Sequence, residues 1–212
     1  MSADTDGDRH HDHDHDHDHD HDIVPGLPLS SDDVDDTVRL ELEFLTSLIW
    51  APDAMTTAAV HAVVGTANDR SDASDRHLPL GTLLFLRPAH GALFATIVAR
   101  VDAELPVTPT LVVEGLGDPQ ARAALREVML DVAAPGSRGP GPLPGGADVP
   151  HLATALLDRW YRRGYLGLIA RMSLHGEDAA TDALAGHWAA LTEHQQRAER
   201  RWSSVRTLLA RL

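Results

Sequence analysis

The sequence predicts an all-α protein made of a small globular helical bundle followed by a long antiparallel αα-hairpin. Two observations carry this prediction. Apolar residues recur every three or four positions through most segments, which is the spacing that places them on one face of a helix. Near the C-terminus the spacing becomes a heptad repeat, and two long helices packed side by side are the usual reason for such a repeat.

Residues 1–36 are predicted to form a disordered tail. They hold 13 of the 32 acidic residues, all of them aspartate, and one arginine, Arg9. The stretch 10–22, HHDHDHDHDHDHD, contains seven histidines and no apolar side chain. Such a segment cannot bury enough surface to offset the entropy lost on folding. The rest of the chain keeps 19 acidic residues and 17 arginines, so the predicted folded part is nearly neutral.

A globular helical subdomain is expected over residues 37–134. Its first helix is predicted from Thr37 to Trp50, with Asp36 as the N-cap. A second helix is predicted after Asp53, which is placed to cap it, and it ends near Gly65. This pair supplies the first two apolar faces of the bundle.

The second part of this subdomain is punctuated by turn formers and prolines. Residues 66–80, TANDRSDASDRHLPL, are polar and are predicted to form a loop. Pro88, Pro109 and Pro119 each suit the first turn of a helix, where the missing N–H costs nothing. Residues 119–133 then show clear helical spacing.

A flexible linker is predicted over residues 135–147, PGSRGPGPLPGGA, and the hairpin over 148–212. The first arm is expected to cover 148–173 and to stop at Gly176. The second arm carries the heptad positions, which predict packing against a helix of the same chain or of another copy. The candidate interface residues on this heptad seam are Leu184, Trp188, Leu191, Gln195, Trp202, Val205 and Leu209; Ala198 and Leu212 complete the spacing.

Composition excludes several classes of function. The chain has no cysteine and no lysine, so disulfides, thiolate metal sites, cysteine nucleophiles and lysine-dependent chemistry are all excluded. No apolar run approaches the roughly 18 residues that span a bilayer. The acidic, His-rich N-terminus is unlike a signal peptide, so the expected location is the cytoplasm.

Two stretches resemble the N-terminal collar domain of DnaB-like replicative DNA helicases. LELEFLTSLIWAPDA, residues 40–54, is similar to that domain's opening helix and the break after it. LFLRPAHGALFATIVARVDAELPVTPTLVVEGL, residues 84–116, is similar to its most recognisable stretch, with Thr108 where the family usually has aspartate. The likeness covers residues 38–210. Two departures are a longer loop at 66–82 and no clear counterpart of the family's GG-x-x-Y-L element.

The resemblance implies binding roles. In the family this domain pairs through its hairpin, builds a ring collar and binds primase, while ATP hydrolysis belongs to a separate RecA-like motor. The motor needs a G-x-x-x-x-G-K-[ST] loop, which a chain without lysine cannot contain. The expected function is therefore a non-catalytic protein of DNA replication, a homo-oligomer or a partner of the replicative helicase or primase, with no membrane association.

The alternating tract is the candidate metal site. His11, His13, His15, His17, His19 and His21 alternate with aspartates, and imidazole and carboxylate ligands suit Zn²⁺, Ni²⁺ or Cu²⁺. The alternative function is accordingly metal handling, by buffering of these ions. Simpler interpretations are a solvating tail that binds metal only because its histidines are dense, or a segment added for purification.

Two arginine clusters on the hairpin are candidates for contact with nucleic acid or an acidic partner. They consist of Arg159, Arg162 and Arg163 on the first arm and Arg197, Arg200 and Arg201 on the second. The i, i+3, i+4 spacing places each cluster on one helical face, and Trp160, Tyr161 and Trp202 lie beside them. The balanced charge favours a plainer interpretation, in which the arginines are a solvated face paired with Asp158, Glu193 and Glu199. DNA is therefore the weaker of the expected partners.

A catalytic site is not expected. Histidines are scattered outside the tract, and no Glu-x-x-His pair or serine-centred elbow accompanies them. His90, in RPAHG, has the look of a reactive residue, but Pro88 places it in the first turn of a buried helix. Arg87 and His90 are therefore expected to make structural hydrogen bonds that fix the entry of the chain into that helix.

Overall fold

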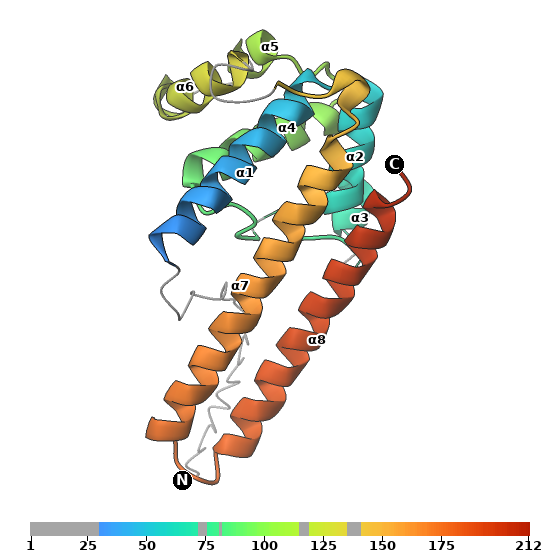
Figure 1. Ribbon diagram of the computed structural model, residues 1–212. Helices are drawn as coiled ribbons and strands as arrows, with labels where there is room; N and C mark the ends of the chain where they lie inside the picture. The colour runs from blue at the N-terminus through green and yellow to red at the C-terminus, as the bar shows by residue number, and fades with distance from the viewer. Residues whose placement is uncertain (1–29, 72–75, 81, 115–118, 135–140) are drawn as a thin grey trace, which may run out of the picture.

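The computed structural model describes residues 30–71, 76–80, 82–114, 119–134 and 141–212, and every regular element among them is helical. The all-α prediction is confirmed, and a helical globule leads into a long pair of helices (Figure 1). The elements are α1 Ser31–Trp50, α2 Asp53–Val64, α3 Ala67–Ser71, α4 Pro88–Asp102, α5 Pro109–Glu114, α6 Pro119–Ala133, the 3₁₀ turn η1 Pro144–Gly146, α7 Val149–Asp178 and α8 Leu184–Leu209.

Helix α1 begins at Ser31, earlier than predicted. Ser30 is its N-cap, and its side-chain hydroxyl accepts a hydrogen bond from the Asp33 backbone N–H. Asp32 and Asp33 occupy the first turn, where a negative charge is favoured by the helix dipole. The predicted tail boundary at residue 36 and the Asp36 cap are therefore wrong. The aspartates between residues 32 and 36, which were assigned to the tail, belong to the first turns of α1. The rest of the predicted tail, residues 1–29, lies outside the described residues.

The predicted loop at 66–80 contains a short helix, α3. The Thr66 hydroxyl accepts from the Asp69 backbone N–H, while the Asp69 carboxylate accepts from the Thr66 backbone N–H. This reciprocal pair is a capping box with aspartate in the usual place of glutamate. Hydrogen bonds from Thr66 hold the pKa of Asp69 below its usual value. The preceding helix, α2, ends at Val64, next to the predicted Gly65, which is its C-cap and has a φ of 73° that favours glycine.

The proline-marked helix starts are confirmed. Pro88 stands in the first turn of α4, and α5 and α6 begin at Pro109 and Pro119. Thr108 acts as expected at the start of α5, where its hydroxyl accepts from the Leu111 backbone N–H at 3.4 Å. A proline at each start fixes the backbone without removing a needed donor.

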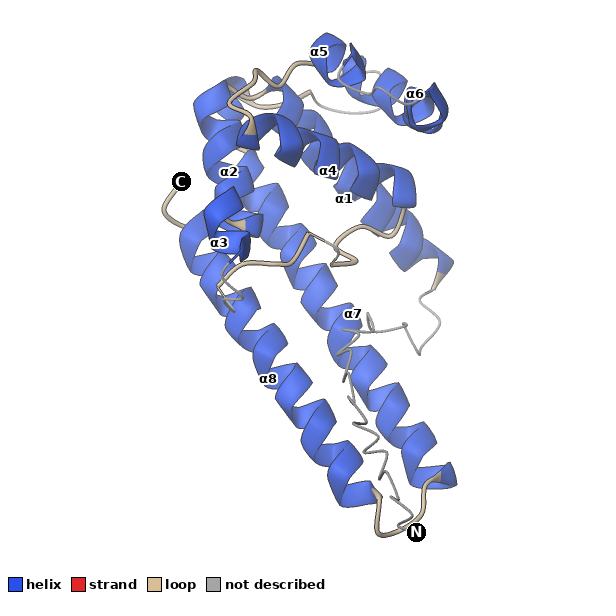
Figure 2. Ribbon diagram, turned by 180° about the vertical axis from the view of Figure 1, so that it is seen from behind, coloured by secondary structure: helices blue, strands red, loops and turns tan. Residues whose placement is uncertain are grey.

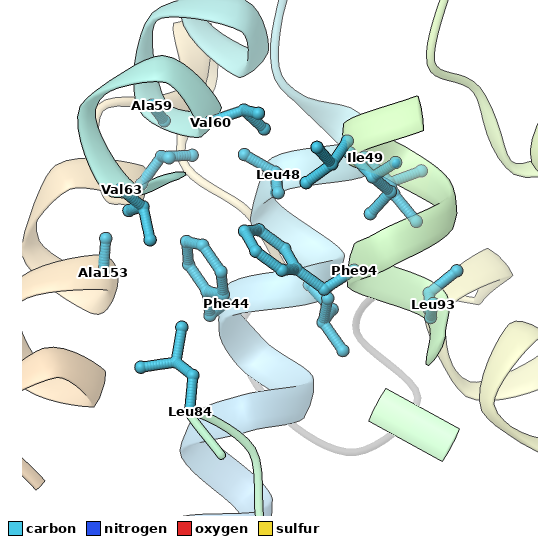
Figure 3. Close-up of a cluster of buried hydrophobic side chains, with 14 of the residues drawn as sticks. Phe44, Leu48, Ile49, Ala59, Val60, Val63, Leu84, Leu93, Phe94 and Ala153 are labelled. Carbon is cyan, nitrogen blue, oxygen red and sulfur yellow. The ribbon is translucent and has the colours of Figure 1, made fainter. Parts of the chain in front are cut away.

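The core lies where α1, α2, α4 and α7 meet (Figure 3). Phe44, Phe85 and Phe94 form its aromatic centre, with ring centroids 5.3 to 6.4 Å apart. Such tilted and offset aromatic arrangements add to the free energy gained from buried area. Aliphatic side chains such as Leu48 and Val60 surround the rings, both fully buried. This core fixes the relative position of α1 and α4, on which the site described below depends.

Part of the predicted linker is packed rather than free. Residues 135–140 lie outside the described residues, but Gly146 is buried, and a side chain there would meet Ala51 at 2.6 Å. Both Gly145 and Gly146 have φ near +70°. The glycines that indicate flexibility in the sequence therefore serve a tight turn that seats the start of α7 against the end of α1.

Helices α7 and α8 form the expected hairpin and extend beyond the globule on one side (Figures 1 and 2). The predicted stop at Gly176 is wrong, because α7 continues to Asp178. A glycine inside a helix costs about 1 kcal/mol relative to alanine. Packing against α8 opposes that cost near the tip, where the His175 and His187 rings stack at 4.2 Å between centroids.

Candidate functional site

A buried carboxylate–imidazole pair lies beneath the start of α4. The Glu41 carboxylate, from α1, is fully buried and lies 2.7 Å from Nδ1 of His90, which is 3 % exposed. It also accepts hydrogen bonds from the backbone N–H groups of Leu86 and Arg87. The carboxylate oxygens act as acceptors for these backbone donors, and the same role toward Nδ1 of His90 assigns the ring nitrogen as the donor. The carboxylate thus stands at the N-terminus of α4, where the helix dipole favours a negative charge.

The structural interpretation of RPAHG is confirmed for His90, with one correction for Arg87. The His90 ring is held by Glu41, so it is not presented to a substrate. Arg87 acts through its backbone: its N–H reaches Glu41, and its carbonyl accepts from the N–H groups of His90 and Gly91. Its side chain is exposed. His90 stands out in the sequence, whereas its partner, Glu41, was not among the expected site residues.

Arg159 and Arg163 tie the hairpin to the globule. Arg159 donates to the Thr37 hydroxyl at 2.9 Å, and Arg163 donates to the carbonyls of Leu83 and Leu84 at 3.0 Å. Burial lowers the pKa of Arg163, and attraction to Glu41 opposes part of that effect. These two arginines therefore have structural partners inside the chain, while a contact of the α7 cluster with nucleic acid stays a prediction. Arg162 remains exposed.

The three arginines of the α8 cluster have different surroundings. Arg197 lies 4.0 Å from Glu193, which is one of the expected ion pairs. Arg200 is exposed and Arg201 is half-buried. Asp158, expected to pair with an arginine, instead accepts from the indole N–H of Trp202 at 2.7 Å. The three arginines therefore do not form one uniform basic face.

The heptad seam is used mainly inside the chain. Val205 and Leu209 are buried in the core, and the Trp202 ring stacks on Tyr161 with 5.0 Å between centroids. Gln195 donates to the Tyr161 hydroxyl at 3.1 Å. Leu184 and Leu191 are half-buried on the same seam. Of the two partners that the heptad spacing allowed, most of the seam therefore packs against a helix of the same chain, α7.

Trp188 is the exception among the seven candidate interface residues, with 60 % of its surface exposed. Tyr165 and Ile169, one turn apart on α7, are 49 % and 50 % exposed. Two hydrogen bonds fix how the arms face each other, one between Trp202 and Asp158 and one between Gln195 and Tyr161. They place the side of α7 that carries Tyr165 and Ile169 next to the side of α8 that carries Trp188. We call Tyr165, Ile169 and Trp188 the distal apolar strip.

Metal and membrane features are limited in the described part of the chain. The six candidate metal-binding histidines of the tract lie outside it. Within it, no group of three or more histidine, aspartate or glutamate side chains is arranged to hold a metal ion. No helix among the described residues has both the length and the hydropathy needed to cross a bilayer.

Comparison with known proteins adds no relative. No protein-family model, curated protein or solved structure matches this chain. The likeness to the collar domain of DnaB-like helicases therefore stays a prediction from residues 40–54 and 84–116. The geometry adds one fact about those two stretches: Glu41 in the first and His90 in the second are bonded to each other.

Proposed function

We propose that this chain is a non-catalytic, DnaB-collar-like protein of DNA replication that self-associates through the tip of its hairpin and binds the replicative helicase or primase in the cytoplasm. The observation that carries the proposal is the distal apolar strip. Three large side chains are half exposed on one side of the helical hairpin, which extends past the globule (Figure 1). Exposed apolar side chains that cluster, rather than lie singly, mark interaction surfaces.

The chemistry of the strip suits a protein partner. Tryptophan and tyrosine are enriched at interface hot spots because they bury large areas with few rotatable bonds. Both arms of the hairpin contribute residues to the strip. If the hairpins of two copies pack side by side through it, they form a four-helix bundle, which is a common arrangement of paired hairpins. The globule is held to the hairpin by Arg159 and Arg163, so the arm is presented in a fixed direction.

Two variants test self-association. Trp188→Glu places a charge in the strip, and Leu174→Glu places the same charge on an equally exposed leucine. Leu174 follows Tyr165 by nine residues, half a turn out of phase, and so faces the other side of α7. Light scattering should show a concentration-dependent oligomer for the wild type and the Leu174 variant and a monomer for Trp188→Glu. Monomers at all concentrations for the wild type would contradict the proposal.

Partner binding needs its own measurement. Purified replicative helicase and purified primase are immobilised separately, and the full-length chain is passed over each. Binding to one of them that weakens at least tenfold in Trp188→Glu, or about 1.4 kcal/mol, supports the proposal. Binding to neither would remove the helicase and primase part of it and leave only self-association.

Metal handling is the second candidate function, and the alternating His–Asp repeat at 10–22 is the observation that favours it. Calorimetric titration of the full chain with Zn²⁺ and Ni²⁺ should show binding that disappears when the tract histidines are replaced by serine. The two functions separate if oligomerisation and partner binding persist in that variant. Loss of partner binding along with the metal would favour the metal-handling function instead.

A further inference from the structure

A cavity of about 210 Å³ opens beside the first half of α4. Pro88, Gly91 and Phe94 line it from the helix, and Leu80 and Leu83 line it from the chain that leads into the helix. The two leucines are 49 % and 52 % exposed, so water reaches the apolar wall that they form. An apolar ligand in this cavity would remove that wall from water, which is favourable.

Two polar side chains belong to the lining, those of Thr82 and Arg87. The Arg87 side chain is exposed, and no carboxylate in the described part of the chain pairs with its guanidinium. The backbone of Thr82 makes the local turn, because its N–H donates to the Pro79 carbonyl and its carbonyl accepts from the Leu84 N–H. A guanidinium and a hydroxyl at an apolar cavity supply the donors that a carboxylate accepts.

Gly91 leaves space on the cavity side of α4. A Cβ added there would lie 4.0 Å from the Phe85 side chain, which is an ordinary van der Waals contact. The φ of Gly91 is not positive, so the backbone conformation does not require glycine either. Glycine is a poor helix former. Neither local packing nor backbone geometry therefore accounts for this residue, whereas an unfilled cavity in front of it does.

We propose that this cavity binds a small carboxylic acid in its ionised form, with an aliphatic body of about seven carbons. One water molecule occupies about 30 Å³, so a volume of about 210 Å³ has room for about seven groups of that size. The carboxylate pairs with Arg87 and Thr82, and the aliphatic body contacts Leu80 and Leu83. A phosphate ester brings more charge than one guanidinium neutralises. The site is independent of self-association, because the cavity and the distal apolar strip share no residue.

Octanoate is the probe that tests the site, since it joins a carboxylate to seven aliphatic carbons. In ¹H–¹⁵N spectra of the full-length protein, octanoate should cause saturable shifts centred on residues 82–95, half complete at a concentration on the order of millimolar. 1-Octanol has a similar chain without the charge and should bind about fivefold more weakly. Shifts that do not saturate, shifts confined to the distal apolar strip, or equal affinities for the two ligands would overturn the proposal.

Variants of Arg87 and Gly91 separate the charge from the cavity. Arg87→Gln should weaken octanoate binding about fivefold and leave 1-octanol binding unchanged, while Arg126→Gln, at an exposed arginine of α6, should change neither. Gly91→Leu fills the cavity and should abolish binding of both ligands, whereas Gly91→Ala, which adds one methyl group, should retain it. Circular dichroism establishes that each variant is folded. Unchanged octanoate affinity in Arg87→Gln or in folded Gly91→Leu contradicts the assignment.

Discussion

Glu41→Ala is expected to be the most damaging of the substitutions considered for the globule. The carboxylate accepts from two backbone N–H groups and from His90 while fully buried. Each hydrogen bond to a charged group contributes about 1.5–3 kcal/mol, and removing one partner of a buried pair costs about 3–5 kcal/mol. Since the three bonds share one group and are not additive, we expect a loss of about 3–5 kcal/mol in the free energy of unfolding.

Urea unfolding followed by far-UV circular dichroism measures this loss. For a chain of this size it corresponds to a fall in melting temperature of roughly 6–20 °C. Glu43→Ala is the control, because Glu43 lies on the same helix but is exposed, and its ion pair with Arg39, at 3.0 Å, is exposed too. An exposed pair of this kind contributes about 0.3–0.5 kcal/mol. A loss below about 1 kcal/mol for Glu41→Ala, or equal losses for both variants, would refute the reasoning.

Three further predictions concern the turn before α7, the capping box and the hairpin. In urea unfolding, Gly146→Ala should destabilise the fold by more than Gly145→Ala. Both glycines have φ near +70°, but only a side chain at Gly146 would meet a neighbour, the Cβ of Ala51 at 2.6 Å. Gly145→Ala therefore measures the backbone strain alone, about 1–2 kcal/mol. Asp69→Asn should be less stable than the wild type at pH 6. Because the folded pKa of Asp69 is lowered, that difference should shrink as the pH falls from the unfolded value of 3.8 through the folded one, and a constant difference would contradict it. Trp202→Ala should lower the free energy of unfolding by about 3 kcal/mol through loss of packing. Thermal melts measure this change, and Trp188→Ala, which removes an exposed side chain and should cost little, is the comparison.

Most element positions could be predicted because short-range signals decide them. Proline at the first helical turn located α4, α5 and α6, and the heptad spacing located α8. Errors arose where one residue type serves two purposes. Aspartates near residue 32 could extend an acidic tail or favour a helix start, and glycines near 145 could loosen a linker or permit a tight turn. Contacts with residues that are distant in the sequence decide between these alternatives.

The site was harder to predict than the fold. Glu41 stands on the buried face of α1, one turn before Phe44 and Leu45. A lone acid at that spacing is a usable signal for a buried carboxylate. Its partner His90 lies 49 residues away, and no local pattern links the two. The same limit applies to Arg163, whose carbonyl partners lie in a loop of irregular structure.

The solution mass of the protein tests the central claim most directly. Sedimentation velocity over a range of concentrations should show a shift from monomer to oligomer for the wild type, with Trp188→Glu remaining a monomer of 22.9 kDa at every concentration. Leu174→Glu should behave as the wild type does. A wild-type chain that stays monomeric at the highest concentration, or a Trp188→Glu chain that still assembles, would contradict the account of the distal apolar strip.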